Sequence, residues 1–306
     1  MTPNPSILVL GAGQLGMAVL RNLAPRAGKG KLSVLLRASS IESADPAKRQ
    51  DLAELRALGV EVVQGDLARQ SSDDLAATFR AYDTVVSCTG FVGGPGVQRK
   101  IARAALDAGV TRFVPWQFGV DYDVIGRGSP QDLFDEQLDV RDMLRAQTAT
   151  EWIIISTGMF TSFLFEPAFG VVDLAADTVN ALGSLDNAVT LTTAEDIGVL
   201  TAAILHADPR IANQVVHVAG DTVTYREVAD ALERVRGRKF ARREWPVPEL
   251  MHLLAAEPHD AMCKYRAVFA QGRGVAWDKA NTFNRERGIP VCGMEQWLRE
   301  NLARRP

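Results

Sequence analysis

The most specific chemical signal in the sequence is a glycine-rich hexapeptide near the N-terminus, Gly11-Ala12-Gly13-Gln14-Leu15-Gly16. It follows the apolar run 6–10 directly and opens a stretch, 14–23, with helical periodicity. In this strand–turn–helix context the first glycine allows a tight turn, the second lets the backbone approach a pyrophosphate, and the third lets helix and strand pack closely. The N–H groups at the start of the helix then face the phosphates. The whole hexapeptide is therefore predicted to bind a dinucleotide.

The end of the second apolar run predicts which dinucleotide binds. A site for NAD usually places an acidic residue here to hold the ribose hydroxyls. In this chain Arg37 follows the run 32–36, and Lys48 lies at the start of the next helical stretch. A guanidinium donates forked, charge-assisted hydrogen bonds that suit a 2′-phosphate. The two cations therefore predict NADPH over NADH; the alternative is that both are ordinary solvated surface residues.

Polar and glycine residues also follow the next two apolar runs. Asp66 comes after the third run, and Thr89 and Gly90 come after the fourth. Ligands of a parallel sheet bind at the carboxyl ends of its strands, so we expect these residues to contact the cofactor as well. For Asp66 a turn or helix-capping role is an equal alternative.

These residues must be positioned by a regular alternation of apolar runs and amphipathic stretches in the first half of the chain. The predicted strands are 6–10, 32–36, 60–63, 84–87, 112–115 and 152–155, and the predicted helices between them include 14–23, 46–58, 98–108 and 131–147. Such alternation implies βαβ crossovers and a parallel sheet covered on both faces. We therefore expect an α/β, doubly wound (Rossmann) fold. Residues 1–157 would form the NADP(H)-binding domain and residues 158–306 a smaller, mostly helical substrate-side region packed against it.

The composition is that of an ordinary folded protein, with 47% hydrophobic and 23% charged residues and a formal net charge of -3. It excludes disordered and collagen-like classes and argues against a nucleic-acid partner. The N-terminus lacks the order of a signal peptide, and polar residues interrupt the most apolar stretch, 152–169, so we expect a cytoplasmic protein with no membrane partner. The cysteines and histidines show no metal-ligand spacing, so no metal site is predicted. The sequence leaves a homodimer open.

With these residues in place, the chain resembles the isoflavone reductase-like, or NmrA-like, group of atypical short-chain dehydrogenases, in its aromatic alcohol reductase-type branch. The resemblance extends over nearly the whole length. Besides the glycines it includes Arg37 with Asp45-Pro-Ala-Lys48, Gln64-Gly-Asp-Leu67, Thr111-Arg-Phe-Val-Pro-Trp-Gln-Phe-Gly119 and Met294-Glu-Gln-Trp297. It implies an NADPH-dependent reductase of phenylpropanoids, isoflavones or lignans. Its 2′-phosphate contacts would fall on Arg37 and Lys48, and we also expect Gln117 at the cofactor.

Two departures from the family pattern bear on catalysis. The family has Ser-Glu where this chain has Trp116-Gln117, and its catalytic lysine falls on Gln137 of Phe134-Asp-Glu-Gln137. A glutamine amide does not titrate, so it cannot deliver a proton. Gln137 could still polarise a substrate oxygen through its N–H. The proton would then come from Tyr122, from water, or from a carboxyl group among Asp121, Asp123, Asp135 and Glu136.

Aromatic side chains are candidates for a pocket that takes a flat aromatic substrate. They are Phe91, Trp116, Phe160, Phe163 and Tyr265. The alternative for each is ordinary core packing.

The sequence thus supports two main hypotheses. The first is an enzyme that uses NADPH to reduce a small aromatic substrate, with Gln137 and Tyr122 as the residues that act on it. The second is a non-catalytic NADP(H) sensor of the NmrA type that binds a partner protein, which the absence of a titratable group at residue 137 favours. An isomerase or dehydratase with bound cofactor is a third possibility. Turnover of NADPH distinguishes the first from the second.

Overall fold

The computed structural model describes residues 5–302, which form two compact units. The first unit contains the chain up to residue 117 together with 136–155 and 197–216. The second contains 118–135, 156–196 and the chain from residue 217 onwards. The chain therefore passes between the units several times, whereas the sequence suggested a single boundary after residue 157.

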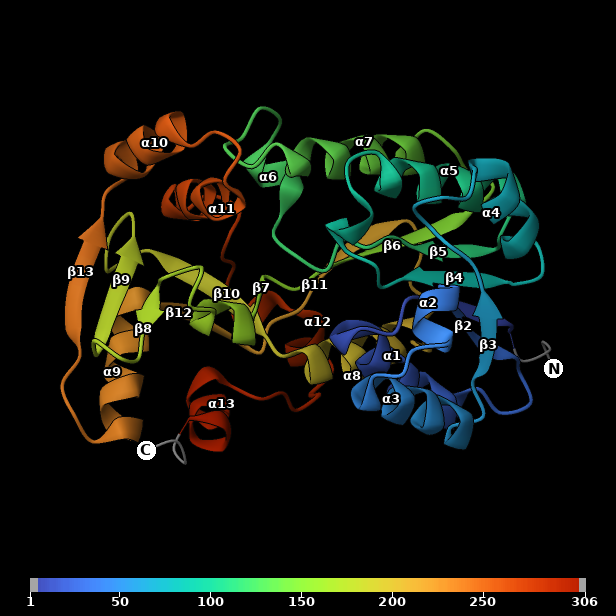
Figure 1. Cartoon of the computed structure of the whole chain (residues 1–306), viewed down its shortest axis with the longest axis horizontal. Coiled ribbons are helices and arrows are strands. Elements are labelled where there is room, and N and C mark those ends of the chain that lie inside the picture. Colours follow the sequence, from blue (N-terminus) through green and yellow to red (C-terminus); the bar gives the residue numbers. More distant parts are fainter. Residues whose placement is uncertain (1–4, 303–306) are drawn as a thin grey trace. The chain divides into compact units, whose positions relative to one another are not determined.

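The first unit is built on a seven-stranded sheet with the order β11-β6-β5-β4-β1-β2-β3 (Figure 1). The ladders from β3 through β6 are parallel, which confirms the predicted doubly wound α/β class. All six predicted strands form, and β11 adds a seventh. The strands are β1 (Ile7–Leu10), β2 (Leu32–Leu36), β3 (Glu61–Gln64), β4 (Thr84–Ser87), β5 (Arg112–Val114), β6 (Glu151–Ser156) and β11 (Gln214–His217).

Helices cover both faces of this sheet, with α4, α5 and α7 on one side and α1, α3 and α8 on the other (Figure 1). Every residue of β1 and β2 is buried as a result, which explains why these strands are apolar without alternation. The helices are α1 (Gln14–Leu23), α3 (Pro46–Ala57), α4 (Ser72–Phe79), α5 (Val97–Ala108), α7 (Leu133–Arg145) and α8 (Ala194–Leu205). α5 ends at Gly109, whose φ of 69° gives a left-handed C-cap.

The second unit differs from the mostly helical region that the sequence predicted, because it also holds two small sheets. One is β12-β10-β7 and the other is β13-β9-β8. The strands are β7 (Met159–Phe160), β8 (Val172–Asp173), β9 (Thr178–Leu182), β10 (Ala188–Thr192), β12 (Asp221–Thr224) and β13 (Ala241–Trp245). The helices are α6 (Tyr122–Ile125), α9 (Tyr225–Arg236), α10 (Val247–Ala256), α11 (Ala261–Ala270), α12 (Phe283–Glu286) and α13 (Met294–Asn301).

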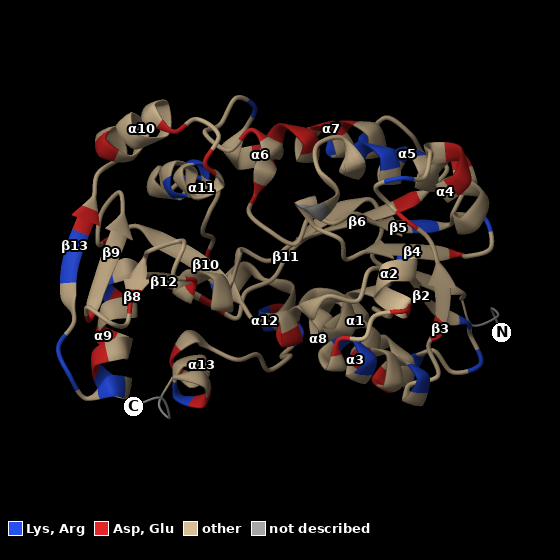
Figure 2. Ribbon diagram, in the orientation of Figure 1, with Lys and Arg blue, Asp and Glu red and all other residues tan. Residues whose placement is uncertain are grey.

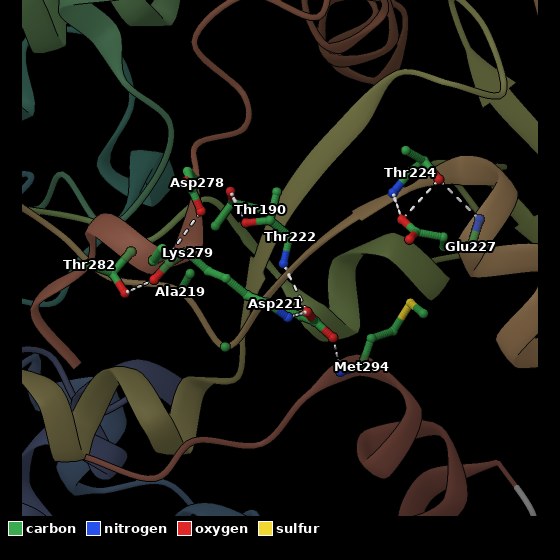
Figure 3. A network of polar contacts seen from close by, with 12 residues as sticks. Thr190, Ala219, Asp221, Thr222, Thr224, Glu227, Asp278, Lys279, Thr282 and Met294 are labelled. Carbon is green, nitrogen blue, oxygen red and sulfur yellow. Dashed lines mark hydrogen bonds and ion pairs between the residues drawn. The ribbon is translucent and has the colours of Figure 1, made fainter. Parts of the chain in front are cut away.

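A polar network organises the C-terminal part of this unit (Figure 3). Asp221 at the start of β12 accepts from Lys279 Nζ at 2.8 Å and from the backbone N–H of Met294, the first residue of α13, at 3.2 Å. The hydroxyls of Thr190 and Thr222 meet at 2.9 Å across the β10–β12 pair. One carboxylate therefore fixes both the segment before α12 and the start of α13.

β13 is an edge strand whose sequence, Ala-Arg-Arg-Glu-Trp, carries no apolar alternation (Figure 2). Arg242 pairs with Asp230 at 2.6 Å and with Glu233 at 3.3 Å. Charges on an edge strand oppose edge-to-edge association, which is a structural role. No helix within residues 5–302 is long and apolar enough to cross a membrane.

Candidate functional site

A cavity of about 430 Å³ opens within the first unit at the carboxyl ends of β1 to β4. β1 lies between β2 and β4, so the strand order reverses its direction at β1. This is the switch point at which nucleotides bind in doubly wound sheets. The predicted cofactor residues that the structure brings together around this cavity are Gly11, Ala12, Gly13, Arg37, Lys48, Asp66, Thr89 and Gly90.

The fold itself requires two glycines of the hexapeptide. Gly11 has a φ of +89°, and a Cβ there would lie 2.6 Å from Oγ1 of Thr89. A Cβ on Gly16 would collide with the carbonyl oxygen of Gly11. Gly13 is different, because a Cβ there would meet no atom within 4 Å and its φ of -75° suits any residue. The packing of the fold therefore does not require a glycine at residue 13, and the open space beside it can hold a ligand.

The start of α1 is suited to hold an anion. Gly13 is its N-cap, and no side chain caps the first turn among the described residues. The first N–H groups of the helix are thus left for a ligand such as a pyrophosphate. Gln14 is exposed, whereas the side chain of Leu15 is buried, so Leu15 can contribute only backbone here.

Two cations line the other end of the cavity. Arg37 occupies the N-cap position of the short helix α2 (Ala38–Ile41), and Lys48 lies in the first turn of α3. Both side chains are exposed, and within residues 5–302 neither takes part in a hydrogen bond or ion pair. Ser40 lines the same region. Unpaired cations beside a hydroxyl fit a phosphate dianion.

Asp66 serves mainly as a local cap. Its Oδ1 accepts from the backbone N–H groups of Ala68 at 2.9 Å and Arg69 at 3.1 Å. This is the turn role that the sequence offered as the alternative. The residue still lines the cavity, so it shapes the wall without offering a free carboxylate.

The loop after β4 is fixed from two sides. Thr89 Oγ1 donates to the carbonyl oxygen of Leu10 at 2.9 Å, and Gln98 Nε2 donates to the carbonyls of Thr89 and Gly90, each at 2.9 Å. The indole of Trp116 packs on Gly90, where a Cβ would lie 3.1 Å from the ring. Trp116 also meets Phe91 edge-to-face, with ring centroids 4.7 Å apart. Two of the predicted substrate residues are thus paired beside the loop after β4.

Gln137 is fully buried in α7, and neither atom of its side-chain amide has a hydrogen-bond partner among the described residues. Leaving a buried donor and acceptor unpaired costs about 1–3 kcal/mol each, so native structures rarely do so without a ligand or water. Gln117 is also fully buried, but its amide is engaged: it donates to the backbone carbonyl of Gln137 at 2.8 Å and accepts from Arg141 Nε at 2.7 Å. Its polar atoms therefore face α7, whereas the sequence had suggested that they face the cofactor.

The carboxyl groups beside Gln137 are taken up by the backbone. Glu136 accepts from the N–H groups of Gly96, Gln98 and Arg99 at 2.7, 2.8 and 3.1 Å, so it caps the start of α5. Asp135 accepts from the N–H of Gly128 at 3.0 Å. The sequence suggested both carboxyl groups as proton sources, but in the structure each accepts hydrogen bonds from backbone N–H groups and so stabilises the local fold.

The second unit gathers its own aromatic cluster. Phe134 meets Tyr122 at 5.0 Å and Tyr265 at 6.2 Å, and Phe163 meets Tyr265 at 5.6 Å, all edge-to-face. Burial raises the pKa of Tyr265 to about 12, so its phenol stays neutral. Phe160 ends β7 and pairs in register with Thr192; within residues 5–302 it makes no ring contact with the cluster.

Sequence reasoning missed one pairing in this unit. His217 Nε2 lies 3.2 Å from Asp121 Oδ2, and the indole of Trp277 packs edge-to-face on the imidazole at 4.9 Å. The two residues are far apart in the sequence, and the only signal was that each follows or ends a strand. Among the described residues no group of acidic, histidine or cysteine side chains has the arrangement of a metal site. Cys88 lines the cavity, but burial raises the pKa of its thiol, so it acts as a small apolar residue.

Comparison with known proteins finds relatives that match nearly the whole chain. The model of the NmrA-like family matches residues 3–276. An NmrA-like family domain-containing oxidoreductase from Gibberella moniliformis is 49% identical over 305 residues, which cover 98% of this chain and 99% of that protein.

Two solved structures share the fold. The crystal structure of an isoflavone reductase has a TM-score of 0.79 and 20% identity, covering 97% of this chain and 99% of that one. The binary complex of leucoanthocyanidin reductase with NADPH from Vitis vinifera has a TM-score of 0.78 and 19% identity, covering 96% and 98% of the two chains.

Proposed function

The chain belongs to the NmrA-like family of oxidoreductases, and from this premise we propose that it is an NADPH-dependent reductase acting on a small aromatic substrate. The observation that carries the proposal is the cavity itself. Its wall leaves space at Gly13, offers the uncapped start of α1, and includes Arg37 and Lys48, whose charges suit a 2′-phosphate. The structural relative solved with NADPH supports the same cofactor.

In this proposal bound NADPH supplies the hydride. The N–H of Gln137 donates to the substrate oxygen and stabilises the negative charge that develops there, because a preorganised donor in a dry site needs no reorganisation. Trp116 and Phe91 offer apolar faces beside Gly90 that suit a phenylpropanoid-, isoflavone- or lignan-like ring. Tyr122 supplies the proton; its ring is fixed against Phe134, and Gly119 leaves room for its hydroxyl.

The second candidate is the non-catalytic NADP(H) sensor. One observation favours it: residue 137, the position of the family's catalytic lysine, carries an amide that does not titrate. Purified protein titrated with NADPH and then offered aromatic alcohols, enones and lignan ethers separates the two candidates. Substrate-dependent loss of the reduced cofactor's absorbance supports the reductase. Tight binding without turnover on any substrate favours the sensor.

Replacing Gln137 with alanine should lower kcat by about 100-fold, the usual cost of removing one donor that stabilises an oxyanion. Gln137→Leu, which keeps the volume of the side chain and removes its donor, should lower kcat by a similar factor. Steady-state kinetics measures both. Gln296→Ala, an exposed amide bonded to Glu300, is the matched control and should leave kcat unchanged. Full activity in Gln137→Ala would remove this residue from the mechanism.

Tyr122→Phe keeps the ring packed on Phe134 and removes only the hydroxyl. We expect kcat to fall by about 100-fold with NADPH affinity unchanged, because general acid catalysis contributes roughly that much or more. Tyr225→Phe is the control, as Tyr225 is an equally buried phenol in α9. If both variants turn over like the natural protein, the proton does not come from Tyr122.

A further inference from the structure

Gln117 ties the end of β5 to α7 at the residue that carries the unpaired amide. Its Nε2 donates to the carbonyl of Gln137, and its Oε1 accepts from Arg141, one helical turn further on. Both Gln117 and Arg141 are fully buried. The contact therefore acts in a dry environment, where hydrogen bonds are strong and their loss is not replaced by water.

A side-chain amide of this length satisfies both neighbours. A backbone carbonyl can only accept, and a guanidinium can only donate, so the residue between them must offer one donor and one acceptor. Glutamate would keep the acceptor for Arg141 but place an oxygen against the carbonyl of Gln137. Leucine would keep the volume and lose both bonds. The chemistry of residue 117 is thus fixed by its two partners.

A second set of hydrogen bonds holds the same turn of α7. Glu136, the neighbour of Gln137, is bonded to three N–H groups at the start of α5. In that same turn of α5, Gln98 donates to the carbonyls of Thr89 and Gly90 in the loop after β4, here termed the cofactor loop. The start of α5 therefore links the loop after β4 to the residue that precedes Gln137.

The two sets of hydrogen bonds are part of a closed ring of contacts. Trp116, adjacent to Gln117, packs on Gly90, so the cofactor loop contacts the end of β5 as well as α5. Going round the ring, Gly90 contacts Trp116, Gln117 contacts Gln137, and Glu136 and Gln98 lead back to Gly90. All of these residues belong to the first unit.

We infer that Gln117 is a positioning residue: it sets where the amide of Gln137 lies relative to the cofactor loop. The inference rests on the proposed function, in which Gln137 binds the substrate oxygen. A misplacement of about 1 Å can cost roughly 100-fold in rate, so a residue that never touches substrate can control turnover through its neighbour.

The test is a double-mutant cycle on the full-length protein. Gln117→Glu, which removes one donor at constant shape, should lower kcat by about 10- to 100-fold with the KM for NADPH unchanged. In a Gln137→Ala background the same change should have less than about a twofold further effect, because it acts through the missing amide. Gln147→Leu is the matched control: this amide bonds Leu144 and Thr150 at the far end of α7. Its effect on kcat should be equal in both backgrounds.

Hydrogen exchange gives a readout that does not depend on activity. Gln117→Leu should speed exchange of α7 amides near residues 137–141 by about tenfold or more, because both hydrogen bonds of the Gln117 amide are lost, whereas Gln147→Leu should affect only the end of the helix. Gln117→Glu takes its place if the leucine variant does not fold. Additive effects of Gln117→Glu and Gln137→Ala would overturn the inference. If the natural protein turns over no substrate, the proposed function fails, and unchanged exchange in α7 then overturns the positioning role independently.

Discussion

Arg37→Ala should raise the Kd for NADPH by about 10- to 100-fold while the Kd for NADH changes less than about twofold. A hydrogen bond to a charged group contributes about 1.5–3 kcal/mol, and only NADPH carries the phosphate that Arg37 would bind. Fluorescence titration with both cofactors at one fixed, low salt concentration measures the difference, since salt screens exposed charges.

Arg56→Ala is the matched control for this experiment. Arg56 is an exposed arginine near the end of α3 that does not line the cavity, so its loss changes net charge by the same amount. Equal NADPH affinity in the natural protein and in Arg37→Ala would remove the 2′-phosphate assignment. A loss shared equally by NADPH and NADH would show that Arg37 supports the fold of the loop instead.

The second large effect concerns Gly13 and Gly16, which lie three positions apart and should respond differently to alanine in stability and in NADPH affinity. Gly16→Ala should destabilise the protein by about 3 kcal/mol, because the new methyl group meets the backbone carbonyl of Gly11, which cannot move aside. Gly13→Ala should change the free energy of unfolding by less than about 1 kcal/mol, since its Cβ meets nothing. The same variant should raise the Kd for NADPH by about tenfold or more, because the methyl group occupies space needed by the pyrophosphate.

Denaturant unfolding and cofactor titration on the two variants separate packing from binding. Each variant serves as the other's control, since the substitutions are chemically identical and lie in the same loop and helix. An unaltered NADPH affinity in Gly13→Ala would contradict the placement of the pyrophosphate. Unaltered stability in Gly16→Ala would contradict the close approach of α1 to the loop after β1.

The parts of the fold that depend on local sequence were predictable. The hexapeptide and the apolar runs around it define β1, α1 and β2 within one residue, because each element is strongly patterned and the two strands are followed by Gly11 and Arg37. β13 was not predictable, since Ala-Arg-Arg-Glu-Trp lacks any alternation and forms a strand only because β9 lies beside it. α4 depends on a short capping box, Ser71 with Asp74, that was overlooked.

The candidate site divides in the same way. Residues that follow strands, such as Arg37 and Thr89, could be placed at one edge of the sheet from topology alone. The tasks of Gln117 and Glu136 could not be predicted, because their partners lie about 20 and 40 positions away and depend on how α7 packs. The sequence was therefore sufficient to identify most of the polar residues that line the cavity, but not to predict which polar side chains make structural hydrogen bonds instead.

The most direct measurement uses NADPH carrying deuterium at C4, incubated with the purified protein and an aromatic substrate that it consumes, followed by mass spectrometry of the product. We expect one of the two C4-deuterated epimers to give one deuterium per product molecule, bound to the carbon that has been reduced, and transfer in Gln137→Ala to be about 100-fold slower. Product that contains no deuterium from either C4-deuterated epimer, or cofactor that binds tightly and keeps its label with every substrate offered, would contradict a reductase.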